Sequence, residues 1–139
     1  MPDNRTQRQR SYNMSRIHSN DTLPEMVVRR YLYAHGLRYR LHLKHLSGKP
    51  DIVLTKSKKV IFVNGCFWHR HKKCIYAKIP SSNMHFWQNK FKNNVKRDKR
   101  NIKVLENDGW LVKVVWECQL SKEKQDKTLK GLLEWLLEN

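Results

Sequence analysis

Residues 51–63 have the sequence DIVLTKSKKVIFV, in which two short apolar runs flank a polar link. The runs Asp51–Leu54 and Val60–Val63 are rich in β-branched residues, and Thr55–Lys59 between them has the composition of a turn. Such a pattern is typical of a β-hairpin. The alternating segment Arg38–Leu43 precedes it, so we expect three neighbouring strands that form a β-meander.

An amphipathic helix is expected before these strands. Thr22 and Glu25 have the spacing of a capping box, and Pro24 is tolerated in a first helical turn. The pattern predicts a helix that runs to His35 and is ended by Gly36. In the simplest interpretation, Glu25 is a helix-capping residue.

A longer helix is predicted after the strands, from near Ser82 to Gly109. Its buried face is marked by apolar residues at helical spacing: Trp87, Phe91, Val95, Ile102 and Leu105. Asp98 lies in the gap of this stripe, and an acidic side chain on an apolar face must be paired, hydrogen-bonded or functional.

The remaining pattern completes an α/β (α+β) domain. Leu111–Trp116 is predicted as a buried strand, and a C-terminal helix follows with apolar residues at Leu129, Leu132, Leu133 and Leu136. We therefore expect a small mixed central sheet flanked by helices over residues 21–139. Residues 1–20 are predicted to be a flexible basic arm, either a disordered tail or a segment that orders along a DNA groove.

The chain has a large excess of positive charge, with 29 Lys+Arg against 12 Asp+Glu and a formal net charge of +17. The positive residues cluster in the arm and in the second helix, at Arg5, Arg8, Arg10, Arg16, Lys90, Lys92, Lys96, Arg97, Lys99, Arg100 and Lys103. Such clusters commonly neutralise phosphates, so we expect a nucleic-acid partner. Charge alone does not distinguish DNA from RNA, or binding from cleavage.

Composition excludes other classes of protein. No segment approaches the ~18 consecutive apolar residues that a membrane span requires, so we expect no membrane partner. The three cysteines cannot all pair within one chain, which excludes a disulfide scaffold and favours a reducing cytoplasm.

Metal-ligating residues gather after the hairpin. Cys66, His71 and Cys74 have the spacing C-x4-H-x2-C, and Cys118 follows the predicted strand Leu111–Trp116. Three cysteines and one histidine form a structural zinc site, in which four protein ligands leave no open position for water. The alternatives are buried free cysteines with incidental histidines, or His69 in place of His71 as the ligand.

Acidic residues are scarce, and their positions suggest a second metal site. Phosphodiester cleavage requires a hard cation held by carboxylate oxygens. Asp51 follows Gly48-Lys49-Pro50, although one such aspartate is also a common turn residue. Asp51, Glu25 and Asp98 are the candidates to surround one site, with His69 as the proton-transfer group.

Three aromatic residues are candidates for contact with bases. Phe67 and Trp68 are adjacent in a polar loop, where both side chains cannot easily point inward. Exposed aromatics on a basic protein suit stacking on bases or insertion between base steps. Trp87 is a third candidate, with a place in the helical core as the equal alternative.

The loop VNGCFWHRH at residues 63–71 is similar to that of the very short patch repair (Vsr) family of DNA mismatch endonucleases. The resemblance also covers short motifs in chain order: Asn13-Met14-Ser15, Asp21-Thr22 with Glu25, Gly48-Lys49-Pro50-Asp51, Phe86-Trp87, Asn94 to Asp98 with Arg100, and Gly109 to Cys118. It implies a restriction-endonuclease-like fold and an enzyme that nicks one strand next to the thymine of a T:G mismatch. Such mismatches arise when 5-methylcytosine is deaminated.

The resemblance also implies residue roles. Asp51 and the Val63 carbonyl would hold catalytic magnesium, with His69 as the general base and with Glu25 and Asp98 in support. The structural zinc ligands would be Cys66, His71, Cys74 and Cys118. Phe67, Trp68 and Trp87 would insert into the duplex, and Lys96, Arg97 and Arg100 would contact it. The partners implied are mismatched double-stranded DNA, mismatch-repair accessory proteins and a repair polymerase, for a cytoplasmic, nucleoid-associated monomer.

The chain departs from the family pattern at Asn64, where a second histidine is often found. Asparagine can hydrogen-bond phosphate or water but cannot transfer a proton, so the resemblance leaves more of the chemistry to His69. The acid-x-Lys pattern of the wider nuclease fold is also absent at Phe62-Val63-Asn64. Two rival functions remain open: a zinc-stabilised DNA-binding module without cleavage, and a restriction-type nuclease that cuts intact duplex.

Overall fold

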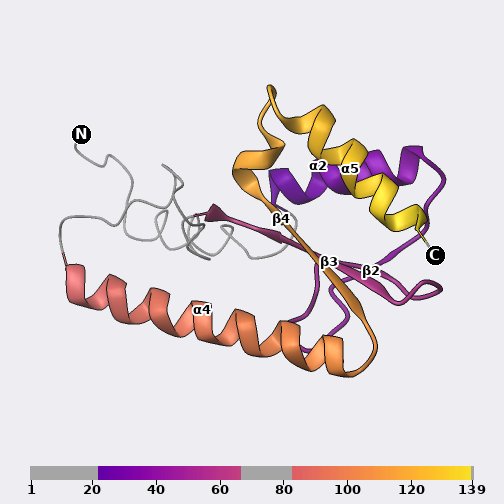
Figure 1. The fold of residues 1–139 in the computed structure, drawn as a ribbon. Helices are drawn as coiled ribbons and strands as arrows, with labels where there is room; N and C mark the ends of the chain where they lie inside the picture. Colours follow the sequence, from indigo (N-terminus) through magenta and orange to yellow (C-terminus); the bar gives the residue numbers. More distant parts are fainter. Residues whose placement is uncertain (1–21, 67–82, 139) are drawn as a thin grey trace, which may run out of the picture.

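The computed structural model describes residues 22–66 and 83–138. The elements in chain order are α2 (Leu23–Ala34), β1 (Arg40–Leu41), β2 (Ile52–Leu54), β3 (Lys59–Asn64), α4 (Met84–Asn107), β4 (Leu111–Trp116), the 3-10 helix η2 (Glu117–Leu120) and α5 (Gln125–Leu137). Figure 1 shows α2 and α5 side by side over one face of the sheet, with α4 on the other face. The predicted arm and the segment between β3 and α4 lie outside the described residues.

The four described strands form one mixed sheet in the order β1-β2-β3-β4. The first three are antiparallel neighbours, with Ile52 opposite Ile61 in the hairpin. β4 runs parallel to β3, from the pair Lys59–Leu111 to the pair Asn64–Trp116. The predicted hairpin, meander and mixed sheet are therefore confirmed, and α4 is the connection that a parallel pair requires.

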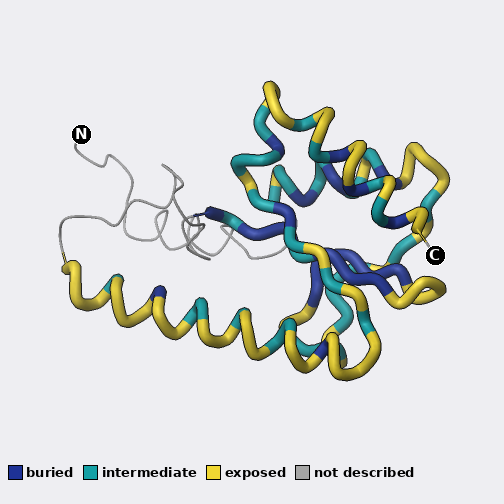
Figure 2. Tube along the Cα trace, viewed as in Figure 1, coloured by how far each residue is buried: buried dark blue, intermediate teal, exposed yellow. Residues whose placement is uncertain are grey.

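Alternation along the strands divides the core between the two faces of the sheet. One cluster joins the sheet to α2 and α5 and contains Val28, Leu32, Ile52, Leu54, Ile61, Val63, Val115, Leu120, Leu129, Leu132 and Leu136. The other contains Val53 and Val60 with Leu105 of α4. Successive side chains of a strand point to opposite faces, so β2 and β3 are buried on both. Figure 2 shows this burial at the centre of the molecule.

Two strand predictions require correction. The predicted strand Arg38–Leu43 shortens to Arg40–Leu41, because the chain turns at His42 with a φ of 49°. The strand Leu111–Trp116 has the predicted bounds but is not a buried strand, since Leu111 is 54% exposed and only Val115 is fully buried. β4 is an edge strand of the described sheet, and edge strands leave part of their surface to solvent.

The helix signals in the sequence predicted the helix ends closely. Thr22 is the N-cap of α2, and its hydroxyl accepts a hydrogen bond from the Glu25 N–H at 3.3 Å. Gly36 and Gly109 follow α2 and α4 with φ values of 84° and 90°, a conformation that favours glycine. In the predicted stripe of α4, Phe91 and Leu105 are buried and the others are half-buried.

None of the described helices has the length and apolar character to cross a lipid bilayer.

Lys59 is a buried lysine at the start of β3, with 3% of its surface exposed. Its ammonium group donates hydrogen bonds to the backbone oxygens of Trp135 at 2.6 Å and Glu138 at 2.7 Å. A cation at this place satisfies terminal carbonyls and complements the negative end of the α5 dipole. The contact joins the sheet to the end of the chain's last helix.

The variant Lys59→Met is therefore expected to lower the free energy of unfolding by about 1–3 kcal/mol, because it removes the charged donor that the carbonyls at the end of α5 share. Urea unfolding followed by circular dichroism measures this difference. Lys56→Met, at an exposed position in the hairpin turn, is the matched control and should unfold near the wild-type midpoint. Equal midpoints for the two variants would contradict the role given to Lys59.

Candidate active site

Three titratable side chains meet where α2, β1 and β2 converge. Glu25, His42 and Asp51 each offer one ligand atom, and these atoms lie within 4.8 Å of one another. His42 Nε2 is 3.0 Å from Glu25 Oε2, and His42 Nδ1 is 3.7 Å from Asp51 Oδ1. The cluster thus brings together the predicted acids Glu25 and Asp51, and adds a histidine that the sequence analysis did not identify.

Asp51 is held at the start of β2 by its neighbour β3. Its Oδ2 accepts a hydrogen bond of 2.7 Å from the Val63 N–H, and the residue is 7% exposed. Desolvation by burial raises the pKa of Asp51 to about 7, and the nearby charge of Glu25 adds to this rise. The Val63 hydrogen bond and the charge of Arg29 oppose it. A buried carboxylate of this kind favours a proton or a cation at neutral pH.

Glu25 is more than a helix-capping residue. It is 1% exposed, and its Oε2 is 3.0 Å from Nη1 of Arg29, one turn further along α2. The sequence motif predicted its position in the first helical turn but not the direction of its carboxylate. Arg29 was also missed, although an acid and a base at i,i+4 on a helix are a known signal of a pair.

His42 was missed because its position depends on one backbone angle. The alternation of Arg38–Leu43 placed it inside a strand, whereas a φ of 49° ends β1 at Leu41. Its backbone N–H still donates to the Asp51 carbonyl oxygen at 3.4 Å. Pairing of the predicted strand with the hairpin was the one sequence signal that could have brought His42 near Asp51.

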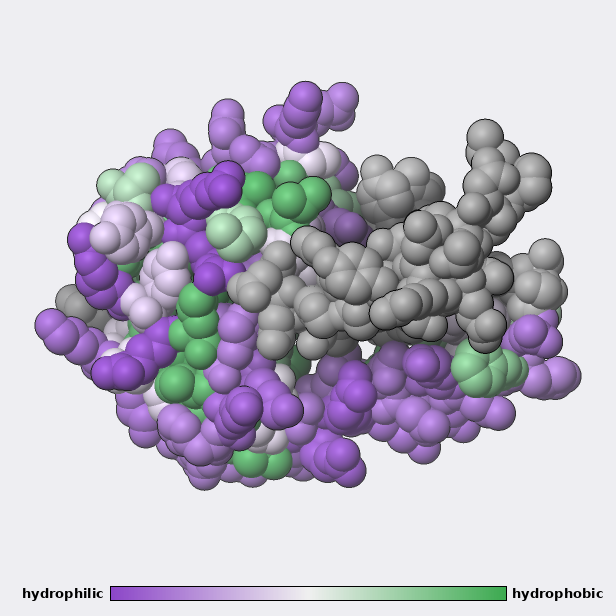
Figure 3. Space-filling model, turned by 180° about the vertical axis from the view of Figure 1, so that it is seen from behind, coloured by the Kyte–Doolittle hydropathy of each residue, from purple (hydrophilic) through white to green (hydrophobic). Residues whose placement is uncertain are grey.

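A cleft of about 1190 Å³ opens between the sheet and α4, next to the cluster. Asp51, Asn64 and Asp98 all line it, so two further predicted site residues reach the same space as Asp51. Its basic lining residues are Lys44, Lys49, Lys90 and Arg97. Asp98 is half-buried, with one carboxylate oxygen 4.0 Å from Arg97 Nη2. Figure 3 shows the hydrophilic surface of α4, as seen from behind.

The loop that precedes Asp51 is fixed against α4. The Ser47 hydroxyl donates to Asn101 Oδ1 at 2.9 Å. Gly48 has a φ of 76°, and a Cβ atom there would lie 2.9 Å from the Asn101 Cβ. The loop therefore has no room for a side chain at position 48, and its path leads directly to Pro50 and Asp51.

Gly48→Ala is expected to destabilise the protein by about 1–3 kcal/mol, because it combines an unfavourable φ with a clash against α4. Gly36→Ala is the control, since Gly36 has a φ of 84° with nothing within 4 Å of its Cβ position. The difference between the two unfolding free energies measures the clash alone. If both variants lose the same stability, close packing of Gly48 against Asn101 is not required.

The parallel pair of strands brings two predicted zinc ligands to one end of the sheet. Asn64 is opposite Trp116, and Cys66 and Cys118 each follow two residues later. Cys66 is buried and Cys118 half-buried. The Cys66 N–H donates to Glu117 Oε1 at 3.4 Å. His71 and Cys74 lie outside the described residues.

The predicted DNA-contacting residues of α4 differ in burial. Lys96, Arg97 and Arg100 are exposed. Trp87 is half-buried, and its ring stacks on buried Phe91 with centroids 5.5 Å apart. This contact favours a packing role for Trp87 in the free protein. Phe67, Trp68 and His69 lie outside the described residues.

A hard divalent cation fits the donors of the cluster. Carboxylate oxygens are the ligands that magnesium and manganese prefer, and imidazole suits manganese and related metals. Two buried carboxylates close together repel each other when ionised, and the pKa of Asp51 is raised chiefly by burial and further by the charge of Glu25. A cation bound at the cluster would offset the cost of ionising these acids, so the donor set and its electrostatics both suit a metal site.

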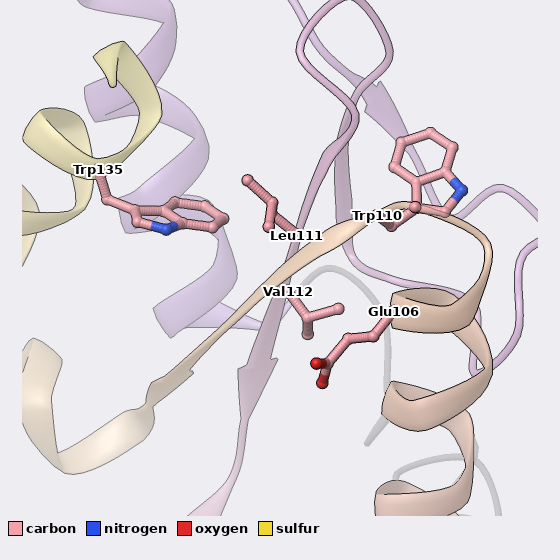
Figure 4. Close-up of a pocket in the computed structure, with 6 residues that line it drawn as sticks. Glu106, Trp110, Leu111, Val112 and Trp135 are labelled. Atoms are coloured by element: carbon pink, nitrogen blue, oxygen red, sulfur yellow. The ribbon is translucent and has the colours of Figure 1, made fainter. Parts of the chain in front are cut away.

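A second pocket, of about 310 Å³, lies where β4 begins, at the end of the strand that is away from Trp116 (Figure 4). Val112 points towards Glu106 of α4, while Trp135 of α5 lies beside Leu111. Among the described residues that line it, Glu106 alone has a carboxylate, so the pocket offers no comparable cluster for a cation.

Comparison with known proteins assigns the chain to a family. The family model for DNA mismatch endonuclease Vsr matches residues 2–75. The chain is 47% identical over 123 residues to the type II nicking enzyme V.NmeAIP of Neisseria meningitidis, covering 88% of this chain and 87% of the relative. It is 42% identical over 130 residues to the DNA mismatch endonuclease Vsr of Escherichia coli, covering 91% and 83%. The chain therefore belongs to the Vsr family of DNA mismatch endonucleases.

Proposed function

We propose that this protein is a magnesium-dependent endonuclease that nicks one DNA strand next to the thymine of a T:G mismatch and so begins very short patch repair. The observation that carries the proposal is the buried cluster of Glu25, His42 and Asp51 beside a cleft with basic walls. Membership of the Vsr family supports the same reaction, since relatives of this chain are nicking enzymes and a mismatch endonuclease.

Asp51 and the backbone carbonyl of Val63 would hold the catalytic cation. When bound, a divalent cation neutralises phosphate charge and favours the ionisation of water. Glu25 keeps the carboxylate of Asp51 within a negative environment that attracts the cation. The hydrogen bond from the Val63 N–H fixes one oxygen of Asp51 and leaves the other towards the rest of the cluster.

The other residues assist proton transfer and phosphate binding in this proposal. His69 is the general base, and Asp98 supports it from the cleft wall formed by α4. Asn64, buried at the end of β3, donates a hydrogen bond to phosphate or water. Lys96, Arg97 and Arg100 bind the DNA backbone, because exposed cations on one helix attract phosphates without regard to sequence.

Selection of the mismatch is assigned to Phe67, Trp68 and Trp87. Insertion of aromatic rings between bases requires unstacking, which costs a few kcal/mol and costs least where pairing is already weak. For Trp87, insertion between bases requires the indole ring to leave its contact with Phe91 when DNA binds. Zinc held by Cys66, His71, Cys74 and Cys118 has a structural role and fixes the loop that carries the aromatics.

A nicking assay with matched duplexes tests the proposal. Full-length protein is mixed with end-labelled duplexes that differ only in a T:G or A:T pair, with and without added magnesium. We expect a single nick in the thymine strand of the mismatched duplex, and only when magnesium is present. Cleavage of both strands of the A:T duplex would establish a restriction-type nuclease instead. Binding without cleavage in magnesium or manganese would establish a DNA-binding module.

Zinc content is measured separately on the purified protein. We expect one zinc per chain by elemental analysis, and loss of the metal in Cys118→Ser. Full activity in wild-type protein that contains no zinc would contradict the structural zinc site.

We further propose that the protein acts as a monomer on chromosomal DNA in the cytoplasm, with mismatch-repair accessory proteins and a repair polymerase completing the patch.

A further inference from the structure

His42 lies at the centre of the cluster, yet none of the steps proposed above uses it. We propose that His42 is a positioning residue for the divalent-cation site, and that its ring holds the carboxylates of Glu25 and Asp51 in one arrangement. This inference rests on the proposed function, because it assumes that Asp51 binds the catalytic cation.

The two nitrogens of the His42 ring face two different carboxylates. Nε2 is 3.0 Å from Glu25 Oε2, and Nδ1 is 3.7 Å from Asp51 Oδ1. The ring therefore lies between the two acids and contacts both. Each edge of the ring therefore faces one carboxylate, which places His42 where it can orient both acids.

Other contacts complete the restraint of both carboxylates. Val63 holds Asp51 Oδ2 at 2.7 Å, so His42 acts on the remaining oxygen of that group. Arg29, one turn further along α2, holds Glu25 Oε2 at 3.0 Å. Removal of the ring would take away the contact to Asp51 Oδ1 and leave that carboxylate to the Val63 N–H and to its neighbour Glu25.

The backbone of His42 is also adapted to this position. Its φ of 49° is uncommon outside glycine, although asparagine, aspartate and histidine tolerate it better than other residues. Its N–H donates to the Asp51 carbonyl oxygen at 3.4 Å, immediately beyond the pair Leu41–Ile52 of the sheet. The same residue thus contacts Asp51 through its backbone and its side chain, which fixes the ring relative to the carboxylate.

The test uses variants of the full-length protein and manganese as the probe. His42→Asn keeps a residue that accepts the left-handed backbone, but its short amide cannot reach both carboxylates. His42→Gln has a longer amide and should restore one of the two contacts. His35→Gln, at the exposed C-cap of α2, is the matched control.

Manganese binding, followed by electron paramagnetic resonance without DNA, gives the primary result. We expect affinity to fall by about 10–100-fold in His42→Asn, as for other residues that orient metal ligands, with a smaller loss in His42→Gln. High magnesium should restore most of the nicking rate of His42→Asn but not that of Asp51→Asn. His35→Gln should bind manganese as the wild type does.

Wild-type manganese affinity in folded His42→Asn would overturn the inference. If that variant does not fold, His42→Gln decides in the same assay, where affinity about tenfold weaker supports the role and unchanged affinity overturns it. Asp51→Asn separates this result from the proposed function. Manganese binding that survives in Asp51→Asn removes the cation site altogether, whereas binding lost there but kept in His42→Asn removes only the role of His42.

Discussion

Replacement of Asp51 by asparagine is expected to abolish nicking, with a loss of about 10³-fold or more, because several kcal/mol of charge stabilisation depend on a cation that this carboxylate holds. The fold should survive the change. An asparagine side-chain oxygen can still accept the hydrogen bond that the Val63 N–H now donates to Asp51. Single-turnover nicking of a T:G duplex, with circular dichroism of the same preparation, measures both effects.

Asp126→Asn is the matched control for this variant. Asp126 is exposed in the first turn of α5 and is not a member of the cluster, so the substitution removes the same charge without changing a cluster residue. We expect it to nick at the wild-type rate. Full activity in folded Asp51→Asn would show that the cation, if required, is bound elsewhere.

The stability of the protein without magnesium is expected to fall as pH rises towards 7. Folding raises the pKa of Asp51 from 3.8 to about 7, chiefly through burial. Between these values the folded protein binds a proton that the unfolded chain has released, so the free energy of unfolding decreases with pH. The contribution is fully present below the unfolded pKa and is lost as pH passes the folded pKa, at about 1.4 kcal/mol for each unit of the shift.

The comparison of wild type with Asp51→Asn isolates this contribution from other titrating groups. Urea unfolding at pH 5 and pH 8 gives the difference in unfolding free energy between the two proteins at each pH. We expect Asp51→Asn to be the more stable protein at pH 8, and its advantage to disappear or reverse at pH 5. Added magnesium should stabilise wild type more at pH 8 than at pH 5, because a proton and a cation compete for one carboxylate. A pH-independent difference would contradict the buried, protonated state of Asp51.

The sequence predicted most of the fold, since its strongest patterns depend on neighbouring residues. Thr22, Gly36 and Gly109 mark helix ends through local backbone chemistry, and the structure confirms all three. The alternation in residues 51–63 predicted the hairpin for the same reason. The exposure of Leu111 was not predictable, because an edge strand and a central strand have similar sequences and differ only in how many neighbours pair with them.

The candidate site was predictable only in part. Asp51 stood out because it follows a loop of glycine, lysine and proline, and Glu25 because of its capping position. Glu25 and Asp51 come close to His42 only through long-range strand pairing and through the His42 φ of 49°. Neither feature produces a periodic pattern in the sequence. Asp98 was suggested by its place on an apolar helix face. The structure shows that this face borders the cleft that Asp51 also lines, which explains why an acidic side chain lies there.

Strand β3 is anchored at both of its ends, by the ammonium group of Lys59 against α5 and by the Val63 N–H against Asp51. A single-residue insertion or deletion between these anchors would reverse which side chains face each layer and detach one of them. Length variation within the hairpin should therefore be confined to the turn at residues 55–57, because the Lys58 carbonyl accepts a hydrogen bond from the Leu111 N–H of β4. In an engineering setting, that turn is the place to graft a peptide tag, while the five-residue interval from Lys59 to Val63 is to be kept at constant length.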